Sequence, residues 1–104
     1  MDINELTHKM NTFVTTKGWY DPNTPKPQTA RNLAISLSLE ASEVLEHYQW
    51  HESDTDENSL PGELADVALY LLQLASVTGI DLEKAILDKL ALNYSRVWPD
   101  EETK

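Results

Sequence analysis

Two pairs of acidic residues stand out because both repeat the same three-residue spacing. Glu40 and Glu43 form the first pair, and Glu63 and Asp66 form the second. Positions i and i+3 lie on one face of an α-helix, so each pair presents two carboxylates together. If the two faces meet, four carboxylates converge, and their repulsion raises their pKa values unless a cation keeps them ionised. An all-oxygen set on rigid helices is typical of a site for Mg²⁺ or Mn²⁺.

The second pair lies in a segment that is apolar around most of a helical circumference. Glu63, Asp66, Tyr70 and Gln73 share one narrow polar stripe on this segment. A carboxylate on a largely buried helix is costly unless it is paired or metal-bound. Arg31 is the sole Lys or Arg in the two segments that carry the pairs, so salt bridges within them do not compensate the charge. The pattern therefore favours a metal site over two solvated acid pairs.

Four helices are expected to position these acids. Apolar spacing predicts helices over about residues 3–16, 29–50 and 59–78, and a fourth that begins at Asp81. Three prolines within residues 19–28 indicate an extended loop, and residues 51–58 read as a solvated acidic loop. The expected fold is all-α, a four-helix-bundle-like subunit whose helices pack into an oligomeric bundle. Residues 1–99 would form one domain, and residues 100–104 a tail.

Composition excludes several classes of function. The 104 residues carry 18 Asp and Glu against 8 Lys and Arg, a net charge of −10, which argues against nucleic-acid polymers and anionic membranes as partners. The absence of cysteine excludes disulfides and thiolate chemistry, and three glycines cannot build a glycine-rich phosphate loop. The first residues lack a signal-peptide pattern, so a cytoplasmic protein is expected. A chain this short also favours self-association.

The acidic spacing resembles that of the all-α nucleoside triphosphate pyrophosphohydrolases, the MazG-like group. The segments 31–34, 48–50, 66–71 and 89–96 are similar to its dCTP pyrophosphatase branch. The resemblance implies hydrolysis of dNTPs, dCTP or a related one, to the monophosphate and pyrophosphate with Mg²⁺. It also implies a homodimer, or a homotetramer built from two dimers. Met10 stands where this branch often carries a histidine, which leaves the base preference open.

The four acids, Glu40, Glu43, Glu63 and Asp66, would hold the metal and take part in catalysis. A metal ion lowers the pKa of its bound water, and Glu43 is the preferred acceptor of the water proton. Eight further residues could bind the nucleotide through stacking, phosphate or sugar contacts, although each also has an ordinary packing or surface explanation. They are Trp19, Arg31, Asn32, Trp50, Tyr70, Lys89, Asn93 and Arg96.

A different class of function fits the same helices. The chain could be a non-catalytic helical protein-interaction module, in which the acids form a solvated or partner-binding surface. Binding of a divalent metal ion distinguishes the two hypotheses, because only the enzyme requires it.

Overall fold

A computed structural model describes residues 1–50 and 59–97 of the chain. This part contains four helices and no strand: α1 (Ile3–Thr16), α2 (Ala30–Glu46), α3 (Leu60–Val77) and α4 (Leu82–Ser95). The all-α expectation is confirmed. The second helix ends at Glu46 rather than at Trp50. The expected acidic loop at 51–58 and the expected tail at 100–104 lie outside the described residues.

Side-chain caps explain where three of the helices begin. Asp2, Thr29 and Asp81 each accept a hydrogen bond from the backbone N–H three residues later, at 2.8, 3.1 and 3.1 Å. Such a bond satisfies one of the N–H groups that a helix start leaves unpaired. Ser59 is the exception, because its side chain makes no cap bond and its Oγ lies 3.3 Å from Nε2 of His47.

Glycines follow two of the helices. Gly18 and Gly79 adopt positive φ values of 77° and 73° after α1 and α3. This left-handed conformation is accessible to glycine at little cost and ends a helix by turning the chain away. The expected ends of the first and third helices are thus confirmed.

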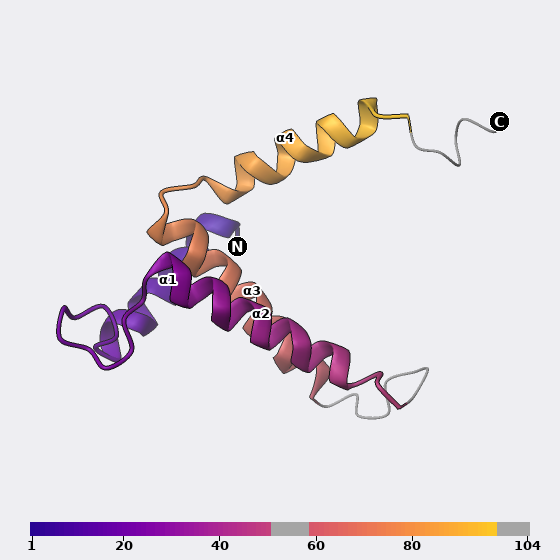
Figure 1. The fold of residues 1–104 in the computed structure, drawn as a ribbon. Helices are drawn as coiled ribbons and strands as arrows, with labels where there is room; N and C mark the ends of the chain where they lie inside the picture. Colours follow the sequence, from indigo (N-terminus) through magenta and orange to yellow (C-terminus); the bar gives the residue numbers. More distant parts are fainter. Residues whose placement is uncertain (51–58, 98–104) are drawn as a thin grey trace.

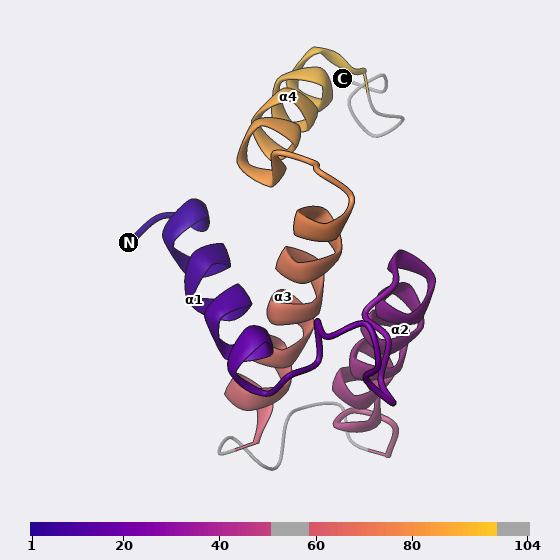
Figure 2. The ribbon, with the colours of Figure 1, turned by 90° about the vertical axis from the view of Figure 1, so that its left-hand side faces the viewer.

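Helices α1, α2 and α3 pack together, with α2 and α3 running antiparallel side by side and α1 against α3 (Figure 2). Met10 and Val14 of α1 and Leu72 of α3 form the buried cluster. On α2, Leu33 is the most deeply buried side chain, with 2% of its surface exposed. The segment 17–29 joins α1 to α2 and lies beside this core, and it runs through turns and bends at residues 17–23 and 25–26 rather than as the expected extended loop. The packing places the middle of α2 against the first half of α3, where the acids are.

Helix α4 stands apart from the other three in both views (Figures 1 and 2). None of its residues is buried, and four of its apolar side chains are 41–59% exposed. They are Ile86, Leu87, Leu90 and Leu92. The radius of gyration is 17.2 Å, against about 13 Å for a compact domain of this length. A single chain therefore leaves α4 with its apolar surface uncovered.

Helix α3 has the length and composition of a membrane span. Its 18 residues have a mean hydropathy of 1.2, and 17% of them are buried within the described part of the chain. Length and composition alone do not distinguish a span from a core helix, and here α1 and α2 both pack on α3. The remaining apolar surface of α3, like that of α4, must meet something other than this chain or be exposed to water.

Candidate functional site

The four acids lie along the line where α2 meets α3. Glu40 and Glu43 come from α2, Glu63 and Asp66 from α3, and the charges of the other three all act on Glu40. Glu40 and Glu63 are half-buried, whereas Glu43 and Asp66 are exposed. The helix phase that the sequence predicted thus brings both pairs to one place.

Glu40 is the most perturbed of these groups. Burial raises the pKa of the Glu40 carboxyl, and the hydrogen bond and charge of Glu43, followed by the charges of Asp66 and Glu63, raise it further. Its Oε2 atom is buried and accepts no hydrogen bond from residues 1–50 and 59–97. The folded chain therefore resists ionisation of Glu40 unless positive charge arrives.

We expect Glu40→Gln to raise the melting temperature in EDTA at neutral pH. A carboxyl whose pKa is raised on folding stabilises the fold when protonated, and that stabilisation disappears as pH rises through the folded pKa. The amide removes this loss, and the difference from wild type should vanish below about pH 4, where Glu40 is protonated in both states. Thermal unfolding from pH 3 to 8 measures it.

Glu46→Gln is the matched control because Glu46 is an exposed acid on the same helix. It changes the net charge by the same amount without entering the acidic cluster. Equal stabilisation by the two variants would assign the effect to net charge and refute a special role of Glu40.

His47 holds one of the acids on α3. Its Nε2 contacts Oε2 of Glu63, and the imidazole side chain is 8% exposed. The Ser59 hydroxyl also contacts Nε2 of His47, at 3.3 Å. A buried imidazole against a carboxylate restricts the carboxylate's rotation, so Glu63 is the best-oriented of the four acids.

The donor set fits a hard divalent cation. All four candidate ligands are carboxylates, and Glu40 offers a buried oxygen that accepts no hydrogen bond within the described ranges. No group of three or more His, Asp or Glu side chains in those ranges is arranged as a complete metal site. Carboxylates that share a face repel one another when no cation is bound. Because the acids lie on two packed helices, rotation of their side chains is the movement that would bring their oxygens together around a metal ion.

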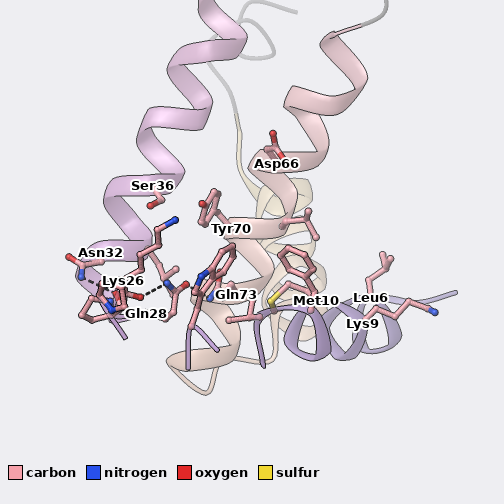
Figure 3. A pocket seen from close by; sticks show the side chains of 17 residues that line it. Leu6, Lys9, Met10, Lys26, Gln28, Asn32, Ser36, Asp66, Tyr70 and Gln73 are labelled. Carbon is pink, nitrogen blue, oxygen red and sulfur yellow. Dashed lines mark hydrogen bonds between the residues drawn. The ribbon is translucent and has the colours of Figure 1, made fainter. Parts of the chain in front are cut away.

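A cavity of about 680 Å³ opens beside the acids, between α1, the segment 17–29, α2 and α3 (Figure 3). Its size is within the range of small-molecule sites. Asp66 lies at one end of it and belongs to both the cavity and the acidic cluster. The lining is mainly apolar with polar groups from α2 and α3. It comprises Leu6, Lys9, Met10, Phe13, Val14, Trp19, Pro25, Lys26, Pro27, Gln28, Asn32, Leu33, Ser36, Asp66, Leu69, Tyr70 and Gln73.

Trp19 forms an aromatic wall of this cavity. Its ring meets Phe13 edge-on, with centroids 5.7 Å apart and an interplanar angle of 82°. The Lys26 ammonium lies 5.1 Å from the Trp19 ring centroid, a cation–π geometry. Asn32 and Tyr70 also line the cavity, and Asn32 Nδ2 donates to the Pro27 carbonyl at 3.0 Å. Three of the eight nucleotide-binding candidates thus share one cavity.

The other five candidates do not line the cavity. Arg31 is exposed at the start of α2, and Trp50 is 82% exposed beyond its end. Lys89 and Asn93 lie on α4 and Arg96 follows it, and α4 makes its main contact with α1. A single chain does not bring these five residues together with the acids, so their roles stay predictions.

The cavity also includes residues that sequence reasoning did not select. Gln28 and Lys26 lie in the proline-containing loop, which carries no periodicity from which an inward side chain could be inferred. Gln73 gave a usable signal, because it continues the polar stripe of Glu63, Asp66 and Tyr70 on an apolar helix. His47 was visible as a flank residue next to the first acid pair, but its contact with Glu63 depends on how α2 and α3 pack.

Comparison with known proteins identifies the protein family of this chain. The model of the MazG-like family matches residues 35–104, more than half of the chain and both acidic pairs. The chain belongs to the MazG-like family. Pyrophosphatases of this family generally need a divalent metal ion, which agrees with the all-oxygen donor set.

Two curated relatives are similar to this MazG-like chain. A dATP/dGTP diphosphohydrolase of Salmonella phage PMBT28 is 36% identical over 81 residues, covering 78% of this chain and 24% of the phage protein. The dCTP pyrophosphatase 1 of Mus musculus is 36% identical over 76 residues, covering 64% of this chain and 44% of the mouse protein. The chain thus spans less than half the length of either relative.

A solved structure covers nearly the whole fold. A pyrophosphatase from Archaeoglobus fulgidus is 32% identical, with a TM-score of 0.75 over 88% of this chain and 87% of that one. The arrangement of the MazG-like helices described above is therefore shared with a solved structure.

Proposed function

We propose that this chain is a pyrophosphohydrolase of deoxynucleoside triphosphates that works with Mg²⁺ and releases a monophosphate and pyrophosphate. The observation that carries the proposal is Asp66, which joins the acidic cluster to a cavity large enough for a nucleoside. The names of the phage, mouse and archaeal relatives support the same reaction class. The substrate would place its base in the cavity and its phosphates at the acids.

The acids would hold the cation at the phosphate end of the site. Glu40, Glu43, Glu63 and Asp66 would be its ligands, and His47 would orient Glu63. A bound divalent ion supplies positive charge toward the phosphates and lowers the pKa of a coordinated water. Glu43, exposed beside Glu40, would accept the proton of the attacking water.

The cavity would hold the nucleoside. The face of Trp19 is suited to stacking on a base, because aromatic rings bind bases through their π-faces. Lys26, close to that ring, adds positive charge to a site on a chain with a net charge of −10. Tyr70 would contact the sugar, and Asn32, farther from the acids, would contact the base.

We also propose that the working unit is a homo-oligomer, a dimer or a pair of dimers. Helix α4 has no buried residue, and α3 keeps apolar surface uncovered. A second copy offers the same kind of apolar helix surface, and pairing like helices buries both at once. In such an assembly Lys89, Asn93 and Arg96 would be available to a neighbouring subunit.

The reaction itself is tested by product analysis. Incubation of the purified chain with each common dNTP and Mg²⁺ should release pyrophosphate and the matching monophosphate, and EDTA should stop the release. Pyrophosphatase-coupled and direct phosphate assays in parallel distinguish pyrophosphate from orthophosphate. Orthophosphate as the first product, or no product from any dNTP, would contradict the proposal. An interaction module would in addition bind no divalent ion in calorimetry.

A further inference from the structure

The end of the cavity away from Asp66 carries two linked amides. Gln73 is 4% exposed, the one buried polar side chain in the described part of the chain, and its Nε2 donates to Oε1 of Gln28 at 2.7 Å. Gln28 Nε2 donates in turn to the Lys26 carbonyl at 2.6 Å (Figure 3). Both glutamines line the cavity. A buried amide at the end of an apolar cavity is a group that can discriminate between ligands.

The orientation of the Gln73 amide follows from this chain of bonds. A backbone carbonyl only accepts, so Gln28 must turn its NH₂ group to Lys26 and its oxygen to Gln73. Gln73 must then turn its own NH₂ group to Gln28. Burial raises the pKa of Tyr20 and the nearby Gln73 side chain lowers it, and the Tyr20 hydroxyl gives its own proton to Asn11 Oδ1 at 2.6 Å.

The amide of Gln73 thus bonds to Gln28 through Nε2 and presents its carbonyl oxygen Oε1 as the acceptor that it can offer to a ligand. Rotation of the amide would exchange oxygen and nitrogen but would place two oxygens, those of Gln73 and Gln28, against each other. The hydrogen bond from Gln28 to the Lys26 carbonyl thus fixes the orientation of the Gln73 amide and keeps its acceptor oxygen Oε1 toward the ligand.

The position of Gln73 matches the far edge of a bound base. Asp66, Tyr70 and Gln73 follow one face of α3 at i, i+4 and i+7, and they span about 10 Å of the helix axis. Asn32, Ser36 and Glu40 follow one face of α2 at four-residue steps, and the first two line the same cavity. Asp66 and Glu40 lie at one end of these two helix faces, and Gln73 and Asn32 lie at the other end.

We propose that Gln73 selects the base, by accepting a hydrogen bond from an exocyclic amino group. This inference rests on the proposed function, and it names the substrate class as nucleotides of cytosine or adenine, the bases with an amino group where uracil and hypoxanthine have an oxo group. Their oxo counterparts, uracil and hypoxanthine, would bring an oxygen against Oε1 and leave two acceptors facing each other. A site built on a hydrogen bond rejects an analogue that lacks the donor, because the buried group is left unpaired.

The experiment compares two matched substrate pairs, dCTP with dUTP and dATP with dITP. In the pair that contains the better substrate, wild type should favour the amino member in kcat/KM by about tenfold or more. Gln73→Met keeps the length of the side chain but removes its hydrogen bonds, and it should bring that ratio close to one. Gln28→Met, at a half-buried position, frees the Gln73 amide to rotate and should lower the ratio by a smaller factor.

Tyr20→Phe is the control, since it removes the hydroxyl that bonds to Asn11, at a residue that does not line the cavity, and leaves the bonds of Gln28 and Gln73 in place. Its ratio should equal that of wild type. The inference is wrong if wild type shows no amino preference, or if the preference survives in both glutamine variants. Circular dichroism confirms folding, and Gln28→Met decides the question if Gln73→Met does not fold.

Binding without turnover separates this inference from the proposed reaction. Calorimetry with dCMP and dUMP, or dAMP and dIMP, measures base selection without catalysis. Selection that depends on Gln73 in a chain that hydrolyses no dNTP would sustain the inference and refute the proposed reaction. Hydrolysis of amino and oxo substrates alike, with no effect of either glutamine variant, would sustain the proposed reaction and refute the inference about Gln73.

Discussion

Asp66→Asn is expected to lower kcat for pyrophosphate release by about a thousandfold while leaving the helix content unchanged. Asp66 is exposed and makes none of the hydrogen bonds or ion pairs formed within the described ranges, so the isosteric amide disturbs no packing. It does remove one full negative charge from the point where the acids meet the cavity. Loss of a metal ligand at a phosphoryl-transfer site costs several kcal/mol of transition-state stabilisation, and ~4 kcal/mol corresponds to about a thousandfold.

Steady-state kinetics and calorimetry with Mg²⁺ and Mn²⁺ measure this effect. Affinity for the divalent ion should fall together with kcat, because both depend on the same carboxylate. Asp88→Asn is the control: Asp88 is an exposed aspartate on α4 that pairs with Lys84, and exposed pairs of this kind contribute little to stability. If the kcat of Asp66→Asn stays within tenfold of wild type and its ion affinity is unchanged, the catalytic centre does not lie at these acids.

The helices could be predicted because their signals are local. Asp2, Thr29 and Asp81 are residue types that cap helices and do so here, and Gly18 and Gly79 end helices through positive φ. Helix phase also predicted that each acid pair would share one face of its helix, and whether the two faces meet was left as a condition. These inferences needed only the period of the helix and the chemistry of the caps.

The cavity could not be predicted, because it depends on contacts between distant segments. Gln28 reaches Gln73 across 45 positions of sequence, and the loop that carries Gln28 has no period from which its direction could be inferred. His47 meets Glu63 only because α2 and α3 pack in this register. Trp50 shows the converse: its residue type suggests a stacking platform, yet it is 82% exposed in the single chain.

The place of α4 could not be predicted from its sequence for a different reason. Its apolar residues follow helical spacing, which indicates burial but does not say against what. In the structure Leu82, the first residue of α4, packs against the core, but the rest of the helix points away from the other three, and the described part of the chain buries none of its residues. The apolar periodicity of α4 is typical of a buried helix, yet the helix is exposed in the single chain. This difference is why we propose that a second copy of the chain covers it.

Leu87→Glu is therefore expected to dissociate the oligomer. Leu87 is 59% exposed in the single chain, and self-association would place it in an interface where a carboxylate has no partner. An uncompensated buried charge costs about 3–5 kcal/mol, which raises the dimer dissociation constant by roughly 10²–10⁴-fold. Light scattering after size exclusion should show wild type at a multiple of 11.8 kDa and the variant at one chain mass.

Lys84→Gln provides the matched control. It changes the net charge by the same amount on α4, but at a position that is solvent-exposed and polar in the single chain. If α4 pairs through its apolar side chains, this control should keep the wild-type mass. A wild-type chain that is monomeric at micromolar concentration, or a Leu87→Glu variant that keeps the wild-type mass, would show that α4 is not an interface. Separation of the subunits should also lower the melting temperature, because it returns the apolar surfaces of α3 and α4 to water.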